Sequence, residues 1–358
     1  MENNSIKRIL IFKLCCFGDI VFLTPTISSL RNNFPNAEIT LISSSWIKNL
    51  YTYIEDVDKL LLYEPPSKRD NIFIKISKAL KLILLLRKNN FDLVFMGHRN
   101  SFFGLIVFLA GIKYRFGFSN TKFLNITAKF EDTINENLRY LKVLKENGFE
   151  VGSAVSKLKI PDNVYDLRRK YDITDNKKIV GVFPFGGLNP GTKMGIKKWN
   201  INKYVELSKR LSEYSDKIVI LFFQGREGEE FYDIEKHNIK NLFSLSTGFE
   251  ISAVCNVFVA GDTGLLHIAA AMGVETIGLF GPSDPRLLAP LNDYGNKNIY
   301  IWKGIECSPC YTPKTAIETK NKKYWNGNIF ICHTGTHNCI NEITVDDVYN
   351  AILNKLKL

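Results

Sequence analysis

The sequence predicts an α/β protein built on two doubly wound parallel sheets. Two observations support this. Short apolar runs alternate with segments of helical periodicity through most of the chain, and the alternation occurs in two series separated by a polar stretch at 151–175 that contains Pro161. Such alternation is typical of βαβ units with parallel strands. We therefore expect two Rossmann-like domains, at 1–165 and 176–340, followed by a C-terminal helix at 344–358.

The first series of elements begins near the N-terminus. Each predicted strand is a short apolar run, and each predicted helix repeats its apolar residues every three or four positions. Strands are expected at 7–14, 38–43, 59–63, 93–96 and 114–117. Helices are expected at 20–33, 72–89, 101–110 and 136–147. This order is that of a doubly wound sheet.

The second series repeats the pattern. Strands are expected at 179–183, 217–222, 254–260 and 276–280. Helices are expected at 201–213, 228–237, 265–272 and 345–355, the last with Thr344 as its N-cap. Two such halves joined by a linker predict a two-lobed protein. Its ligands would bind between the lobes, at the carboxyl ends of the strands.

Composition and apolar runs indicate a globular protein. The chain has 358 residues, of which 45% are apolar and 23% charged, enough for two cores. The longest apolar runs, at 76–86 and 102–112, are shorter than the ~18 residues that a membrane span needs, and core helices are the better interpretation. No signal-peptide core follows the N-terminal basic residues. We therefore expect a cytoplasmic protein.

The formal net charge of +11 raises the question of a nucleic-acid partner. The lysines are scattered, no single helix carries a basic stripe, and no zinc-finger or aromatic RNA-binding motif is present. No nucleic-acid partner is therefore predicted. An anionic membrane surface fits the charge better, because each basic residue near anionic lipid gains about 1 kcal/mol. Biased codon usage would give the same composition, and both interpretations stay open.

The most informative segment is the turn Gly-Asp-Thr-Gly at 261–264, which leads into the predicted helix 265–272. The N–H groups of a first helical turn and the helix dipole both favour a phosphate there. Asp262 or Thr263 would cap the helix. A capped βαβ unit without a ligand explains the turn equally well. His267 is either a phosphate contact or a packed histidine.

Four separated segments resemble glycosyltransferase family 9, the lipopolysaccharide heptosyltransferases. They are Arg-Ile-Leu-Ile-Phe-Lys-Leu-Cys-Cys-Phe-Gly-Asp-Ile at 8–20, Phe-Gly-Gly at 185–187 with Lys-Lys-Trp at 197–199, the turn 261–267 with Gly-Pro-Ser-Asp-Pro at 281–285, and the cysteine-rich end. They follow the family's order over nearly the whole chain. The resemblance implies the GT-B fold, in which two Rossmann-like domains face a cleft. The N-terminal domain would bind the acceptor and the C-terminal domain the nucleotide sugar.

The resemblance also implies the residues of the donor site. Lys197, two residues before Trp199, matches the family's phosphate-binding lysine and would neutralise the leaving diphosphate. Glu229 matches a family glutamate and would hold a ribose. The remaining donor-binding residues would be Gly186, Gly187, Lys198, Asp262, Thr263, Gly264, Leu265 and His267. Without the resemblance, a lysine pair on a loop is explained by solubility, and Glu229 by the helix dipole.

Asp19 is expected at the carboxyl end of the first strand. Inverting sugar transfer requires a base that takes the proton of the attacking hydroxyl, and the resemblance assigns this role to the carboxylate at this position. Asp19 would also serve as the N-cap of the predicted helix. Gly18 would allow the acceptor to approach closely. Lys13 and Arg99 are candidate anion contacts for the acceptor, or else ordinary surface residues.

Four cysteines cluster near the C-terminus, in a predicted insert at 307–339. Cys307 and Cys310 form Cys-x2-Cys, and Cys332 and Cys339 form Cys-x6-Cys. Disulfides are not expected in a cytoplasmic protein. Four soft ligands with a tight first pair suit tetrahedral zinc or iron, and by resemblance some family members bind iron there. A structural metal and four unmetallated thiols are the two interpretations.

The function that we expect is inverting, metal-independent glycosyl transfer without a catalytic cofactor. By resemblance, the sugar would be a heptose from ADP-heptose, and the acceptor a lipid-linked saccharide such as the lipopolysaccharide core. Such an acceptor would bring the protein into peripheral contact with the inner face of the cytoplasmic membrane. The alternatives are a protein O-heptosyltransferase, a nucleotide-sugar epimerase on the same fold, and a basic nucleic-acid or metal-linked binding protein.

Overall fold

The computed structural model describes residues 5–14, 16–67, 70–170, 173, 176–186, 188–189, 191–223, 239–242, 245–293 and 297–358. The chain divides into two compact units, Met1–Ser156 and Lys157–Leu358. Each unit is built on a six-stranded sheet of its own.

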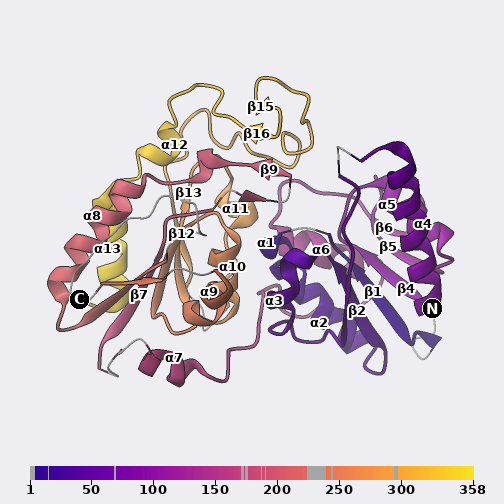
Figure 1. Ribbon diagram of the computed structural model, residues 1–358, viewed down its shortest axis with the longest axis horizontal. Coiled ribbons are helices and arrows are strands. Elements are labelled where there is room, and N and C mark those ends of the chain that lie inside the picture. The colour runs from indigo at the N-terminus through magenta and orange to yellow at the C-terminus, as the bar shows by residue number, and fades with distance from the viewer. Residues whose placement is uncertain are drawn as a thin grey trace. The chain divides into compact units, whose positions relative to one another are not determined.

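The first unit contains a sheet in the order β3-β2-β1-β4-β5-β6, with every strand parallel to its neighbours. Helices α4 (Ile72–Asn89) and α5 (Ser101–Leu109) cover one face, and α2 (Thr24–Asn33) and α6 (Glu136–Lys145) cover the other (Figure 1). Because both faces are covered, β1 and β4 are almost wholly apolar. The strands are β1 (Arg8–Phe12), β2 (Glu38–Ser43), β3 (Lys59–Leu62), β4 (Leu93–Met96), β5 (Tyr114–Phe118) and β6 (Ile126–Ala128).

The second unit has a parallel sheet in the order β11-β10-β7-β12-β13-β14. Helices α8 (Ile201–Leu211) and α13 (Val345–Leu356) cover one face, and α9 (Leu245–Ser252) and α10 (Gly264–Ala271) cover the other (Figure 1). Thr344 caps α13 in a reciprocal capping box, as predicted. The strands are β7 (Lys178–Phe183), β10 (Ile218–Phe223), β11 (Ile239–Leu242), β12 (Val257–Gly261), β13 (Glu275–Phe280) and β14 (Ile299–Trp302).

Both sheets have the same doubly wound strand order, which confirms the predicted α/β architecture. In each sheet the chain extends from its first strand to one side and then to the other. The strand order therefore reverses between β1 and β4 in the first unit, and between β7 and β12 in the second. A crevice opens beyond the carboxyl ends of the strands at such a switch point, and ligands bind there.

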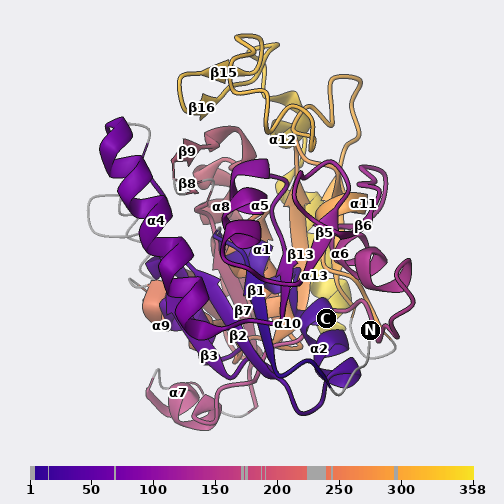
Figure 2. The same ribbon diagram turned by 90° about the vertical axis from the view of Figure 1, so that its right-hand side faces the viewer.

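The remaining elements are short. The segment that contains the cysteines and the loop after β7 together form a four-stranded sheet, in the order β15-β16-β9-β8 (Figure 2). Its core consists of Met194, Ile196, Trp325 and Phe330. Its strands are β8 (Leu188–Asn189), β9 (Thr192–Lys193), β15 (Trp325–Asn326) and β16 (Ile329–Phe330). The short helices are α1 (Phe17–Val21), α3 (Lys48–Tyr51), α7 (Val164–Lys170), α11 (Pro285–Leu288) and α12 (Asn338–Asn341), and 3-10 turns lie at Ser45–Ile47, Gly195–Lys197 and Ser212–Tyr214.

The predicted single helix at 20–33 is wrong, because the chain forms α1 and α2 there with a break between them. Pro25 lies in the first turn of α2, where its missing N–H costs no hydrogen bond. The Thr24 hydroxyl donates to the Val21 carbonyl at 2.8 Å and so satisfies an acceptor at the end of α1. The proline therefore starts a new helix instead of lying inside a longer one.

Two other expectations also need correction. The polar stretch at 151–175 is not only a linker, because it contains α7, whose buried Leu167 anchors it. The apolar run at 76–86 lies in a helix with the predicted bounds, but only Leu82, Ile83 and Leu86 of α4 are buried. The prediction that this apolar run is a core helix is therefore correct for only one face of α4. Within the described ranges, none of the helices combines the length and the apolar composition that a membrane span requires.

Candidate active site

The turn after β12 ends in a capped helix. Thr263 is the N-cap of α10, and its hydroxyl accepts a hydrogen bond of 3.5 Å from the Leu266 N–H. The structure thus selects Thr263 from the two N-caps that the sequence left open. Gly264 and Leu265 begin the helix, where backbone N–H groups have no acceptor within the helix itself. This end of α10 therefore attracts an anion.

Asp262 lies beside this cap and is held by three side chains. One carboxylate oxygen is 2.5 Å from Lys197 Nζ and accepts a 2.6 Å hydrogen bond from the Ser283 hydroxyl, and the other is 3.6 Å from His267 Nε2. Lys197 Nζ also lies 4.4 Å from the centroid of the Tyr311 ring. Burial alone would raise the pKa of Asp262, but Lys197 and His267 outweigh it and hold the pKa well below its usual range. Asp262 is therefore ionised, with Lys197 as its counter-ion.

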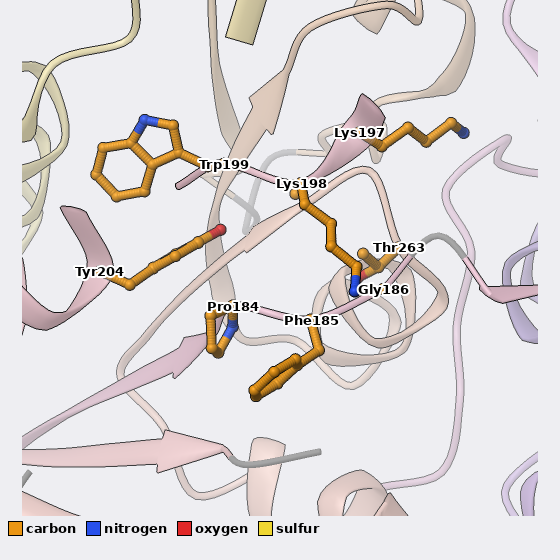
Figure 3. A pocket seen from close by; sticks show the side chains of 9 residues that line it. Pro184, Phe185, Gly186, Lys197, Lys198, Trp199, Tyr204 and Thr263 are labelled. Atoms are coloured by element: carbon orange, nitrogen blue, oxygen red, sulfur yellow. The ribbon is translucent and has the colours of Figure 1, made fainter. Parts of the chain in front are cut away.

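The two adjacent lysines take different positions. Lys197 ends a 3-10 turn, and its side chain is 10% exposed in the ion pair. Lys198 is exposed and extends toward Gly186 and Thr263 (Figure 3). Its Nζ lies 5.9 Å from the centroid of the Phe185 ring. One lysine is thus committed to a buried carboxylate, whereas the other extends toward the capped helix.

Gly186 brings the loop after β7 against the turn after β12. Its φ of 135° lies in the region that favours glycine, and a Cβ there would lie 2.2 Å from Thr263 Cγ2. Trp199 anchors the loop by donating a 2.9 Å hydrogen bond to the Ile343 carbonyl. A small pocket results, lined by Pro184, Phe185, Gly186, Lys197, Lys198, Trp199, Tyr204, Gly261 and Thr263 (Figure 3).

Most predicted donor residues lie around this switch point. The exceptions are Gly187 and Glu229, which lie outside the described residues. Ser283 is a member that the sequence analysis did not single out, although the motif at 281–285 contains it. Nothing in the neighbouring sequence indicates a role for the Ser283 hydroxyl, because its partner Asp262 is 21 residues away in the chain.

Lys13 and Asp19 meet at the switch point of the first unit. Lys13 follows β1, is 6% exposed, and donates to the Gly97 carbonyl at 3.0 Å and to the Tyr140 hydroxyl at 2.9 Å. The same Nζ lies 3.3 Å from the Asp19 carboxylate, whose side chain is 31% exposed. Lys13 is therefore a buried counter-ion, and its interpretation as a surface residue is wrong.

Asp19 lies inside the first turn of α1. The N-cap is Cys16, so the alternative that Asp19 caps the helix is wrong. Gly18 is buried in the same helix. A carboxylate in a first turn is stabilised by the helix dipole, and Lys13 adds a cation beside it. The site thus presents a partly exposed carboxylate on a buried lysine.

His98 follows β4 on the other side of the same switch point, and the sequence analysis did not single it out. Its Nε2 accepts a 2.6 Å hydrogen bond from the Leu14 N–H. Burial, followed by the charge of Lys13, lowers the pKa of His98 to about 3. The imidazole is therefore neutral. Its position directly after a strand at the switch point is the signal that could have identified it.

Arg99, the next residue, is stacked on an aromatic ring. Its guanidinium carbon lies 3.7 Å from the centroid of the Phe130 ring, and that of Arg139 lies 4.6 Å from the same centroid. Burial is the main cause that lowers the pKa of Arg99. Such stacking orients a guanidinium and leaves it able to bind an anion.

The charge state of His98 leads to a prediction for stability at mildly acidic pH. Because the histidine pKa is lower in the folded state than in the unfolded state, the unfolded chain binds more protons between pH 6.5 and 3. From pH 7 to pH 5, the free energy of unfolding should therefore fall by about 2 kcal/mol through this group. A glutamine side chain could accept the same hydrogen bond without titrating, so His98→Gln should remove this loss. Urea unfolding at both pH values measures it, and equal losses in both proteins would contradict the prediction.

The four cysteines lie in one region of the second unit as thiols. Burial, with a smaller contribution from the other cysteines, raises the pKa of Cys310 to about 11 and of Cys339 to about 12. Cys332 Sγ lies 3.2 Å from the Thr334 hydroxyl. In the described part of the chain, however, no three His, Cys, Asp or Glu side chains come together as a group that could hold a metal ion. Cysteine sulfur is a ligand that suits zinc or iron, but the four cysteines, Cys307 included, are not gathered into a metal-binding group in the described residues.

Comparison with known proteins identifies the family of this chain. The family model of glycosyltransferase family 9 (heptosyltransferase) matches residues 79–321. Lipooligosaccharide heptosyltransferase 2 of Campylobacter jejuni is 25% identical over 354 residues, which cover 95% of each chain. Lipopolysaccharide heptosyltransferase 2 of Escherichia coli K12 is 22% identical over 303 residues, or 80% of this chain and 86% of that one.

Solved structures resemble the whole chain. The ADP-heptose lipopolysaccharide heptosyltransferase II of E. coli superposes with a TM-score of 0.70 at 17% identity and covers 98% of this chain and 99% of its own. A family 9 glycosyltransferase from Veillonella parvula superposes with a TM-score of 0.73 at 17% sequence identity, and the match covers 98% of this chain and 97% of that one. An iron-containing dodecameric glycosyltransferase from enterotoxigenic E. coli superposes with a TM-score of 0.57 at 11% sequence identity, and the match covers 98% of this chain and 76% of that one. The likeness confirms the predicted GT-B fold.

Proposed function

Because the chain belongs to glycosyltransferase family 9 and is a glycosyltransferase, we propose that it moves a heptose from ADP-heptose onto a saccharide of the lipopolysaccharide core. The observation that carries this proposal is the switch point of the second unit. There, a capped helix N-terminus lies beside a buried Lys197–Asp262 ion pair. The heptose, the adenine nucleotide and the core acceptor are proposed from the names of the relatives.

The donor diphosphate binds at the N-terminus of α10. The N–H groups of Gly264 and Leu265 and the helix dipole supply fixed positive charge. Lys198 extends toward this position (Figure 3), and Lys197 adds a cation whose direction Asp262 holds. Such preorganised charge stabilises the negative charge that develops on the leaving group. No catalytic metal is required in this proposal.

Asp19 acts as the general base. It takes the proton of the acceptor hydroxyl as that oxygen forms a bond to the anomeric carbon of the heptose. The bond from the anomeric carbon to the diphosphate oxygen breaks, and the electron pair leaves with the nucleoside diphosphate. Attack on the face opposite the leaving group inverts the configuration. Lys13, 3.3 Å away, favours the ionised carboxylate that this step needs.

The acceptor binds to the first unit in this proposal. The stacked Arg99 guanidinium offers an anion contact, and Gly18, buried beside Asp19 in α1, would let the acceptor approach the base. We place the lipid portion of the acceptor in the cytoplasmic leaflet of the inner membrane, which the protein would contact peripherally. A structural zinc or iron at Cys307, Cys310, Cys332 and Cys339 would require the four sulfurs to draw together, and no step of the reaction passes through it.

A donor screen followed by a transfer assay tests the proposal. ADP-heptose should raise the melting temperature of the protein more than GDP- or UDP-sugars do. Mass spectrometry should then show one heptose added to a core saccharide. Interconversion of the donor without any acceptor would indicate an epimerase, and transfer to protein alone would indicate a protein O-heptosyltransferase. Binding to nucleic acid without any nucleotide-sugar affinity would overturn the proposal.

A further inference from the structure

Helix α4 exposes an apolar stripe to solvent. The stripe consists of Phe73, Ile76, Leu80 and Leu84, which are 79%, 50%, 55% and 62% exposed. Their spacing of three, four and four residues places them on one side of the helix. The buried residues Leu82, Ile83 and Leu86 of the same helix pack into the core of the unit. Single exposed apolar residues are ordinary, but a contiguous row of four is typical of an interaction surface.

The stripe leads to the end of α5. Arg87, near the C-terminal end of α4, donates from its guanidinium to the Leu109 carbonyl at 2.8 Å and 3.2 Å. Phe108 and Leu109 are themselves 47% and 42% exposed. We call these two residues and the four of the stripe the apolar patch. Its members come from two neighbouring helices on the same face of the sheet (Figure 2).

The apolar patch has a basic border. Helix α4 contains five lysine or arginine residues and no acidic residue. Lys81 and Lys88 are exposed and follow the stripe along one side, at seven-residue spacing. Beyond the C-terminal end of the stripe, the Arg115 guanidinium carbon lies 5.3 Å from the centroid of the Phe108 ring. Lys78, by contrast, is neutralised by an ion pair with Asp70 at 2.8 Å.

We propose that the apolar patch docks the protein on an anionic phospholipid surface. Large apolar side chains that enter the interface, flanked by cations that meet lipid phosphates, are the chemistry of a helix lying in a membrane surface. A second copy of the chain fits less well, because pairing two such patches would bring like-charged borders together. The assignment of a lipid-linked acceptor depends on the proposed function, whereas the proposed binding of the protein to a lipid surface does not.

Co-sedimentation with vesicles tests the proposal directly. The full-length protein should sediment with vesicles of phosphatidylcholine and phosphatidylglycerol. It should partition at least about tenfold less onto phosphatidylcholine alone, because the basic border then lacks its partners. Added salt should weaken the electrostatic part of the binding. Equal binding to both vesicle types would overturn the proposal.

A matched pair of triple variants locates the surface. Phe73→Gln, Leu80→Gln and Leu84→Gln together should lower partitioning onto the anionic vesicles by about tenfold or more. The control changes three equally exposed apolar residues outside the patch, Ile160→Gln, Tyr165→Gln and Ile317→Gln, which are 60%, 76% and 67% exposed. It should bind like the unaltered protein. Melting temperatures should stay close to wild type in both, because the altered side chains are exposed.

Two further readouts separate this proposal from its rivals. If the patch joined two copies of the chain, size-exclusion chromatography would show an oligomer that only the patch variant dissociates, and the lipid proposal would be overturned. Transfer to a deacylated, water-soluble core saccharide should be unchanged in the patch variant, whereas transfer to the same saccharide in vesicles should fall. The protein could bind vesicles through the patch and yet transfer no heptose. Vesicle binding would then be lost in the patch variant, and only the proposed function would be contradicted.

Discussion

Asp19→Asn is expected to lower the rate of sugar transfer by about a thousandfold, because the amide cannot take the proton of the attacking hydroxyl. The substitution preserves size, and Lys13 keeps its hydrogen bonds to the Gly97 carbonyl and the Tyr140 hydroxyl. The local structure should therefore persist. The residues that we assign to the donor belong to the second unit, so the affinity for the nucleotide should change little. Steady-state kinetics and calorimetric titration with ADP measure the two effects.

The same substitution at an exposed carboxylate provides the control. The Asp166 side chain is 71% exposed and pairs with the nearby Arg169, which is exposed as well, so Asp166→Asn should retain full activity. Wild-type turnover in Asp19→Asn would show that the base is another group. An equal loss of turnover and of ADP affinity would instead indicate a disturbed structure.

The strand and helix pattern could be read from the sequence wherever apolar periodicity alone decides the outcome. The bounds expected for the second strand, for the strand at 93–96 and for the helix at 72–89 are those of β2, β4 and α4. Parallel strands covered on both faces are continuous apolar runs, which are distinct from their polar connections. The break before Pro25 was missed because apolar periodicity continues across it, and a proline is tolerated in a first turn.

The candidate site was predictable in its residue types but not in its pairings. Lys197 and Asp262 are 65 residues apart, and Lys13 and Tyr140 are 127 residues apart. Neither distance in the chain indicates a contact. Asp262 reaches Lys197 only where β12 ends in the folded sheet, and Tyr140 reaches Lys13 only because α6 packs against its own sheet. The periodicity of apolar residues also does not show which apolar side chains are exposed to solvent. Helix α4 carries apolar residues around most of its circumference, and only the packing of the unit shows which side is covered.

Lys197→Met is expected to destabilise the second unit by about 3 kcal/mol and to lower turnover by at least about a hundredfold. The methionine leaves the Asp262 carboxylate, 8% exposed, without its cation. The hydrogen bond from Ser283 remains and limits the cost. Because the pKa of Asp262 is lowered in the folded state, the ion pair stabilises the protein above the unfolded carboxyl pKa of about 4 and loses this effect as pH falls toward the folded value.

A second substitution separates the two roles of Lys197. In Lys197→Met with Asp262→Asn, the buried charge is gone, and the carbonyl of the introduced amide could still accept from the Ser283 hydroxyl, so most of the lost stability should return. Turnover should stay low, because no cation replaces the one opposite the leaving diphosphate. The control is Lys198→Met at the exposed neighbour, which should keep wild-type stability and weaken ADP binding only modestly. Thermal unfolding and turnover measured on all three proteins decide the matter. If Lys198→Met abolished turnover while the double variant regained it, the exposed lysine would be the cation that meets the leaving group, and Lys197 would serve only to hold Asp262 in place.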